Sequence, residues 1–153
     1  MNIRLATLDD VPIISAMYRE FFAEISTMQP RYYRAADEKG EYPMQSIKSD
    51  KSDIFIAESH GNIAGFAHVS EDKTLPYDAI VQYKFAVCME LFVSPIYRKQ
   101  GVATALMNAI KDWAKTRKLE YVELSVLIEN ENAIHLYEEN GFQAVRQIMR
   151  CGL

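Results

Sequence analysis

A turn that combines basic and small residues, Arg98-Lys99-Gln100-Gly101-Val102-Ala103-Thr104, carries the strongest chemical signal in this chain. It follows an apolar run that ends in Val93-Ser94-Pro95, and a segment with helical spacing begins at its end. The first backbone N–H groups of a helix have no partner within the helix, and the helix dipole adds partial positive charge there. Gly101 has no Cβ, so an anion can approach the backbone closely. We therefore expect this turn to bind the pyrophosphate of a cofactor, with Arg98 and Lys99 adding charge.

Two common nucleotide-binding motifs do not fit this turn. A Walker loop needs G-x-x-x-x-G-K-S/T, and no glycine precedes Gly101 within the turn. A dinucleotide-binding motif needs G-x-G-x-x-G, and only one of these glycines is present. The pattern that remains is Arg98-x-x-Gly101-x-Ala103 after an apolar strand. It resembles the pyrophosphate loop of the GNAT N-acetyltransferase superfamily, R/Q-x-x-G-x-G/A, which binds acyl-CoA.

A second motif lies in the segment Asn130–Phe142. Asn130 is a good helix N-cap, Ala133 and Tyr137 share one helical face, and Gly141 predicts where the helix ends. The segment is similar to the GNAT pattern N-x-x-A-x-x-L-Y-x-x-x-G-F and matches it at every fixed position. The two motifs together make the resemblance to the GNAT superfamily specific.

The periodicity of apolar residues predicts the order of the elements. It predicts a strand at 1–6, a helix that reaches residue 25, paired strands at 53–59 and 62–70, a strand at 81–93, a helix at 101–118, a strand at 121–127, a helix from 130, and a last strand at 142–149. Residues 28–53 show no clear period and predict a loop with one or two short helical pieces.

This order is similar to the GNAT order over nearly the whole chain. The resemblance implies an α/β (α+β) fold in a single domain, residues 1–153. Its central sheet would have six or seven strands, mixed but mostly antiparallel, and would be flanked by helices. The resemblance also implies that the strands at 81–93 and 121–127 splay apart.

Composition excludes several classes of partner. The chain has 153 residues and a net charge of −4, so it lacks the basic surface that nucleic-acid binding requires. Cys88 and Cys151 form neither a disulfide framework nor a metal-binding motif. The sequence shows no N-terminal leader and no apolar run of about 18 residues. We therefore expect a cytoplasmic protein with no metal site and no membrane contact.

The resemblance implies that acetyl-CoA is the cofactor. In this fold the gap between the splayed strands holds the pantetheine arm, which pairs with the end of the longer strand. The cofactor-binding residues that follow are Leu91, Phe92, Val93, Arg98, Lys99, Gln100, Gly101, Val102, Ala103, Thr104, Asn130, Asn132 and Tyr137.

Two residues are candidates for proton transfer. Tyr137 is the candidate general acid, because its hydroxyl could reach the departing CoA sulfur; the alternative is an aromatic core residue. Glu90 is the candidate base for the amine, since an acidic side chain in an apolar strand is costly to bury. Two alternatives stay open for Glu90, a wet face of the sheet or a role in orienting the acceptor. Glu123, Ser125 and His68 are weaker candidates for the base.

The sequence thus predicts an N-acetyltransferase that moves acetyl from acetyl-CoA to a primary amine by direct attack in a ternary complex. The alternative is a CoA-binding or regulatory module of the same fold without turnover. The acceptor is a small molecule or a peptide amine: a lid formed by 28–50 would favour the former, an open groove over the sheet the latter. The fold often forms dimers, and a homodimer stays open because no surface stripe marks an interface.

Overall fold

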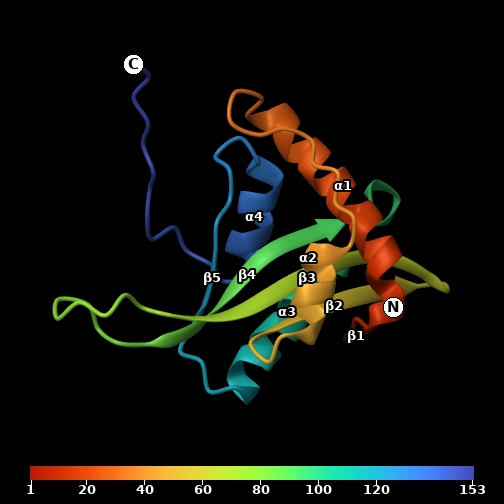
Figure 1. The fold of residues 1–153 in the computed structure, drawn as a ribbon, viewed down its shortest axis with the longest axis horizontal. Coiled ribbons are helices and arrows are strands. Elements are labelled where there is room, and N and C mark those ends of the chain that lie inside the picture. Colours follow the sequence, from red (N-terminus) through yellow and green to blue (C-terminus); the bar gives the residue numbers. More distant parts are fainter.

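Four α-helices and a five-stranded sheet make up the computed structural model, which describes residues 1–153 (Figure 1). The strands are β1 (Asn2–Leu5), β2 (Ser52–Ser59), β3 (Asn62–Lys73), β4 (Lys84–Val93) and β5 (Val122–Leu124). The helices are α1 (Val11–Met28), α2 (Glu41–Lys48), α3 (Val102–Thr116) and α4 (Glu131–Glu139), with 3₁₀ turns at Leu8–Asp10 and Pro95–Tyr97. No helix combines the length and the apolar character that a membrane span requires.

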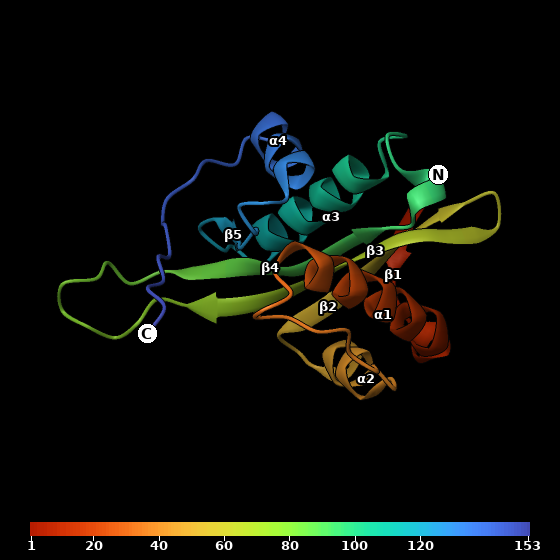
Figure 2. The same cartoon turned by 90° about the horizontal axis from the view of Figure 1, so that it is seen from above.

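The sheet has the strand order β1-β2-β3-β4-β5. The first four strands are antiparallel to their neighbours, and β5 is parallel to β4. A parallel neighbour requires a crossover connection, which α3 supplies. Helices α1 and α2 cover one face of the sheet, and α3 and α4 cover the other (Figure 2). The predicted α+β architecture, with a mixed and mostly antiparallel sheet between helices, is confirmed.

Apolar side chains fill the interface on each face of the sheet. Leu106 and Ile110 of α3 are buried against β3 and β4 on one face. On the other face Tyr18 of α1 packs on Phe66 of β3, with ring centroids 4.5 Å apart. Burying a side chain of this size stabilises the fold by about 1.5–3 kcal/mol. The two apolar layers fix α1 and α3 on opposite sides of β4.

Strand β4 changes its pairing at Met89. Cys88 and Glu90 pair with consecutive residues of β3, so Met89 has no partner there and forms a β-bulge. The pairing of β4 with β5 ends at the same point, at Cys88 and Leu124. A bulge bends a strand and increases its twist, so the rest of β4 continues without a hydrogen-bonded neighbour on that side. The pairing of β4 with β5 therefore ends beside this bulge, and the predicted splaying of the two strands stays a prediction.

The prediction of six or seven strands is wrong, because the segment predicted as a last strand at 142–149 forms none. Beyond Phe142 the backbone makes no backbone hydrogen bond, and every residue is exposed. Strand structure needs a partner strand, and no strand of the same chain lies beside this segment. Strand β5 is also shorter than the predicted 121–127.

Several local predictions are confirmed. His60 and Gly61, at the turn between β2 and β3, both have positive φ, 51° and 78°, as a tight two-residue hairpin turn requires. The region predicted to be a loop with a short helical piece contains α2. The predicted N-cap Asn130 accepts a hydrogen bond from the Ala133 N–H at 3.2 Å.

Candidate active site

The N-terminus of α3 presents free backbone N–H groups. Gly101 is the N-cap, with a φ of 78° in the left-handed region. The Ala105 N–H donates to the Gly101 carbonyl at 3.0 Å, whereas the N–H groups of residues 101–104 donate to no acceptor in the chain. A Cβ on Gly101 would meet no atom within 4 Å, so the space over the helix end is open. This geometry suits a bound anion.

Two of the polar side chains in the turn stabilise its shape. Arg98 donates from Nε to the Val93 carbonyl at 2.8 Å, and its Nη2 pairs with Glu24 of α1. Gln100 donates to the Ile96 carbonyl at 2.9 Å. Lys99 is exposed and forms no ion pair within the chain. Lys99 is therefore the cation of this turn that is free to meet an anion.

The end of β4 exposes part of its backbone on the side that β5 has left. The Phe92 carbonyl faces β3, since a Cβ on Gly65 would lie 2.4 Å from it. Successive residues of a strand point their N–H and C=O groups to opposite sides. The backbone of Leu91 and Val93 therefore faces away from β3, and Arg98 binds the Val93 carbonyl there. The N–H and C=O of Leu91 and the Val93 N–H remain available.

Glu90 lies at the centre of a buried polar cluster on the α1 face of the sheet. Its Oε2 accepts a hydrogen bond from the Tyr18 hydroxyl at 3.0 Å and lies 3.0 Å from Nδ1 of His68. The Tyr42 hydroxyl of α2 lies 3.3 Å from Oε1. Burial and the Glu90 charge raise the pKa of both tyrosines, so each keeps its proton and acts as a donor. Three side chains thus hold the mostly buried Glu90 carboxyl group, which does not lie on a wet face of the sheet.

A pocket of about 260 Å³ adjoins this cluster between α2 and the sheet. Its lining residues are Tyr42, Gln45, Ser46, Ser52, His68, Ser70 and Met89. Nε2 of His68 is buried and has no hydrogen-bond partner. Buried polar atoms are rarely left unpaired, so this nitrogen is open to a donor from a bound molecule or water. Most of the side chains that line this pocket are polar, which suits a small amine or a polar side chain.

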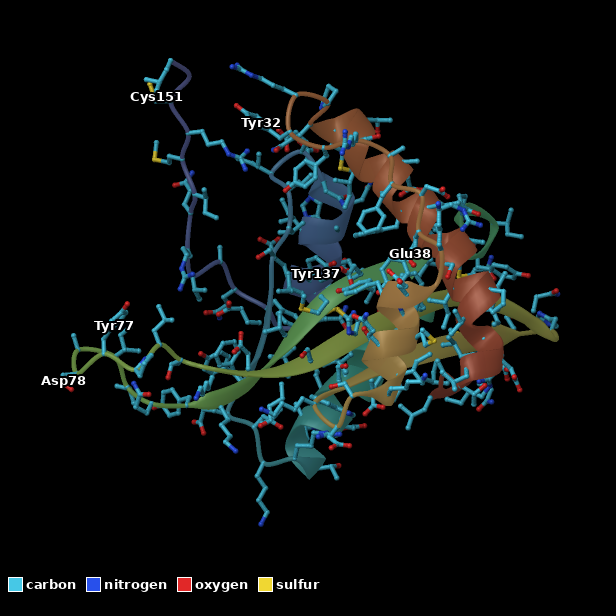
Figure 3. All side chains as sticks on the ribbon, in the orientation of Figure 1. Tyr32, Glu38, Tyr77, Asp78, Tyr137 and Cys151 are labelled. Atoms are coloured by element: carbon cyan, nitrogen blue, oxygen red, sulfur yellow. The ribbon has the colours of Figure 1, made fainter.

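Tyr137 of α4 lies on the opposite face of β4. Figure 3 shows Tyr137 on α4 beside β4. Its ring packs against Phe142 with the centroids 5.9 Å apart, and it lies near enough to Cys88 for the two groups to interact electrostatically. Burial raises the pKa of the Tyr137 hydroxyl, which therefore stays protonated at neutral pH. Burial also raises the pKa of the Cys88 thiol to about 12, so Cys88 is a poor nucleophile.

The predicted site residues fall into three places in the structure. The turn at 98–104 and the end of β4 are contiguous, because Arg98 joins them. Glu90 and Tyr137 lie on opposite faces of β4 near the point where β5 leaves it. Asn130 uses its side-chain oxygen to cap α4, and Asn132 is exposed on the first turn of that helix.

Sequence reasoning missed Tyr18 and Tyr42 and undervalued His68. Tyr18 is separated from Glu90 by 72 positions and Tyr42 by 48, and no spacing rule connects them. The available signal was the alternation in β3, which places His68 on the same face as Phe66 and directly opposite Glu90. A His and a Glu on adjacent apolar strands are a pair that could have been expected.

Known proteins of one family are similar to this chain. The family model described as Acetyltransferase (GNAT) family matches residues 15–142. An uncharacterized N-acetyltransferase of Methanocaldococcus jannaschii is 30% identical over 142 residues, which cover 93% of this chain but only 60% of that relative. The chain therefore spans less than two thirds of that relative's length.

Solved structures show the same fold at low sequence identity. A tetramutant of a Bacillus halodurans protein superimposes with a TM-score of 0.93 at 20% identity, with both chains fully covered. An aminoglycoside N-acetyltransferase solved in complex with CoA gives a TM-score of 0.74 at 20% identity, covering 99% of this chain and 98% of that one. The chain therefore belongs to the GNAT acetyltransferase family, whose enzymes use acetyl-CoA.

Proposed function

We propose that this chain transfers acetyl from acetyl-CoA to a primary amine by direct attack in a ternary complex. One observation carries the proposal: β4 loses β5 at the Met89 bulge, and a carboxylate and a phenol lie on its two faces there. Glu90 faces the side covered by α1 and α2, and Tyr137 belongs to α4 on the other side. Glu90 can thus act on the acceptor from one face of the sheet, and Tyr137 can act on the leaving thiol from the other.

The residues present fit acetyl-CoA, which supplies an acyl thioester when bound. The free N–H groups at the start of α3 and the Lys99 ammonium would hold the pyrophosphate. The available N–H and C=O groups of Leu91 and Val93 would pair with the pantetheine amides. A backbone N–H directed at the thioester carbonyl would stabilise the developing oxyanion, a contribution of about 3 kcal/mol in other acyl-transfer sites.

Proton transfers would complete the reaction. The Glu90 carboxylate would take one proton from the acceptor ammonium, directly or through one water, and free the amine to attack. As the C–N bond forms and the C–S bond breaks, the nitrogen would lose its second proton to water. The Tyr137 hydroxyl would donate its proton to the departing thiolate and regain one from water. The high pKa of the Cys88 thiol argues against an acyl-cysteine intermediate and favours direct transfer.

The test is release of free thiol on mixing the purified chain with acetyl-CoA and a panel of amines. The panel contains a polyamine, an amino acid, an aminoglycoside and a peptide with a free N-terminus. We expect thiol release that depends on one class of amine, and the polar lining of the pocket favours a small or extended primary amine. CoA binding by calorimetry without thiol release from any amine would favour the alternative, a CoA-binding module without turnover.

A further inference from the structure

The pocket between α2 and the sheet has a lining in which most hydrogen atoms are already engaged. It encloses about 260 Å³ on the face of the sheet that α1 and α2 cover (Figure 2). The proposed reaction places Glu90 beside this pocket and gives no role to the polar atoms that line it. What the pocket binds depends on which of these atoms can donate a hydrogen bond and which can only accept one.

The two buried serines of the lining have already used their hydrogen atoms. Ser46 Oγ donates to the Tyr42 carbonyl at 3.0 Å, and Ser52 Oγ donates to the Ser46 carbonyl at 2.8 Å. A hydroxyl has one hydrogen atom and two lone pairs, so each of these oxygens can now only accept. The serines therefore present lone pairs to a bound molecule.

His68 presents an acceptor for a similar reason. Its Nδ1 lies 3.0 Å from Oε2 of Glu90, and an ionised carboxylate can only accept, so the ring hydrogen lies on Nδ1. Nε2 then carries a lone pair. The residue is 3% exposed, and Nε2 has no hydrogen-bond partner in the chain. Because a buried polar atom without a partner is costly, a donor from a bound molecule would stabilise this arrangement.

No cation balances the carboxylate beside the pocket. Glu90 contacts two of the lining residues, Tyr42 and His68, and no lysine or arginine lines the pocket. The Tyr42 hydroxyl directs its hydrogen at Glu90, so its oxygen adds another lone pair. An anion would meet lone pairs and a negative charge here. A primary ammonium carries a positive charge, three N–H donors and no acceptor, so it matches this lining.

We propose that this pocket binds a second ammonium group of the acceptor, which makes the acceptor a short diamine. The inference rests on the proposed acetyl transfer and names the class of amine that it uses. One amino group would lose its proton to Glu90 and be acetylated, and the other would stay charged and donate to Nε2 of His68 and the serine oxygens. The two places are close, because the single ring of His68 contacts Glu90 and lines the pocket. Met89, 46% exposed and flexible, is the lining side chain that can shift as the ammonium enters.

Calorimetry on the full chain saturated with CoA tests the proposal without turnover. Diaminopropane, diaminobutane and diaminopentane are each compared with the monoamine of equal length, propylamine, butylamine or pentylamine. We expect the best diamine to bind roughly 10- to 100-fold more tightly than its monoamine, as hydrogen bonds to a charged group contribute. Aminobutanol, which has a hydroxyl in place of the second charge, should fall between diaminobutane and butylamine. Equal or reversed affinities overturn the proposal, and so does a failure of every diamine to bind.

Thiol release from acetyl-CoA with the same amines separates this proposal from the proposed reaction. We expect kcat/KM for the best diamine to exceed that for its monoamine by roughly 10- to 100-fold. Equal values would overturn the diamine assignment and leave acetyl transfer to an amine in place. Preferential binding of a diamine without thiol release from any amine would refute acetyl transfer and keep the assignment of the pocket.

Two variants locate the second ammonium in this pocket. In His68→Asn the shorter amide can still donate to Glu90 and no longer supplies Nε2, so the ratio of diamine to monoamine affinity should fall toward one. Gln45→Lys places an ammonium in the lining from an exposed position on α2, so the fold should persist by circular dichroism and the same ratio should fall. Gln147→Lys, the same change in the exposed C-terminal segment, is the matched control and should keep the ratio. A ratio that is as high in Gln45→Lys as in Gln147→Lys would exclude this pocket as the binding site.

Discussion

Nδ1 of His68 and Oε2 of Glu90 lie 3.0 Å apart across β3 and β4, and the Tyr18 hydroxyl donates to the same oxygen at 3.0 Å. The other oxygen, Oε1, has only the longer contact of 3.3 Å with Tyr42. Two short hydrogen bonds occupy Oε2, so Oε1 is the atom with a free lone pair for a proton. Since Tyr18 and Tyr42 belong to α1 and α2, both helices orient the carboxylate before any acceptor binds.

Gly101→Glu should abolish CoA binding. The new carboxylate would enter the open space over the α3 N-terminus and repel the pyrophosphate from the free N–H groups there. Calorimetry with CoA measures the loss. Gly101→Asn is the matched control, because Asn tolerates the positive φ of this position and adds no charge. CoA affinity of the Glu variant within a few-fold of the Asn variant would contradict the pyrophosphate assignment.

Tyr137→Phe should lower kcat and leave CoA affinity within a few-fold. Only the proton donor to the leaving thiolate is lost, and general acid catalysis contributes roughly 10²- to 10⁴-fold. Steady-state kinetics with thiol detection, together with calorimetry, separates the two effects. Tyr77→Phe, at the exposed tip of the β3–β4 hairpin, controls for loss of a phenol elsewhere. An unchanged kcat for Tyr137→Phe would show that Tyr137 only packs against Phe142.

The sequence predicted features whose signals are local. The Asn130 cap and the hairpin turn at His60 and Gly61 depend on a few neighbouring residues, and both are confirmed. The Met89 bulge was not predicted, because a bulge depends on the register of β4 with β3, and the residues next to Met89 do not fix that register. The residues that bind Glu90 were missed for a related reason, since α1 and α2 bring them together only after the fold forms.

The failed prediction of the last strand has a different cause. The composition of 142–149 is that of a strand, and this part of the reasoning was sound. Strand propensity describes how a residue fits beside a partner strand, and the partner is a property of the fold or the assembly. Within one chain the segment has no such partner, so its backbone stays unpaired.

Acid should weaken the contact that joins β1 to the start of α1. Arg4 forms a bidentate ion pair with Asp10, at 2.8 and 2.9 Å, and lowers the pKa of Asp10 from 3.8 to about 2. Because the folded pKa lies below the unfolded value, this stabilisation is complete above pH 3.8 and is lost as the pH falls through 2. It amounts to about 2 kcal/mol at neutral pH.

Urea unfolding from pH 6 to pH 2 measures this contribution through Asp10→Asn. The variant should be less stable by about 2 kcal/mol at pH 6, and the difference should shrink toward pH 2. Asp9→Asn, one residue earlier and exposed, should leave stability within about 0.5 kcal/mol at every pH. A difference for Asp10→Asn that stays constant from pH 6 to pH 2 would mean that the effect is steric and not ionic.

Glu90→Gln should lower kcat/KM most at neutral pH, by roughly 10²- to 10⁴-fold. A base is needed only while the acceptor is mainly an ammonium ion, and a lysine-like amine has a pKa of about 10.4. The activity of the variant should therefore recover as the pH rises toward that value. The measurement is the pH profile of kcat/KM for the best amine of the panel. A loss that is independent of pH and appears mainly in the acceptor KM would instead make Glu90 a cation-binding residue.

Tyr18→Phe separates the orientation of Glu90 from its basicity. This change removes one of the two short hydrogen bonds to Oε2 and leaves Oε1, the ring packing on Phe66 and the carboxylate itself in place. If Tyr18 only positions the carboxylate, kcat should fall by roughly 10- to 100-fold, since a single hydrogen bond to a charged group contributes about 1.5–3 kcal/mol. Glu90→Gln with Tyr18→Phe should then be no slower than Glu90→Gln alone, because a positioning residue has no effect once the group it positions is gone. Additive losses in the double variant would show that Tyr18 acts on the acceptor directly.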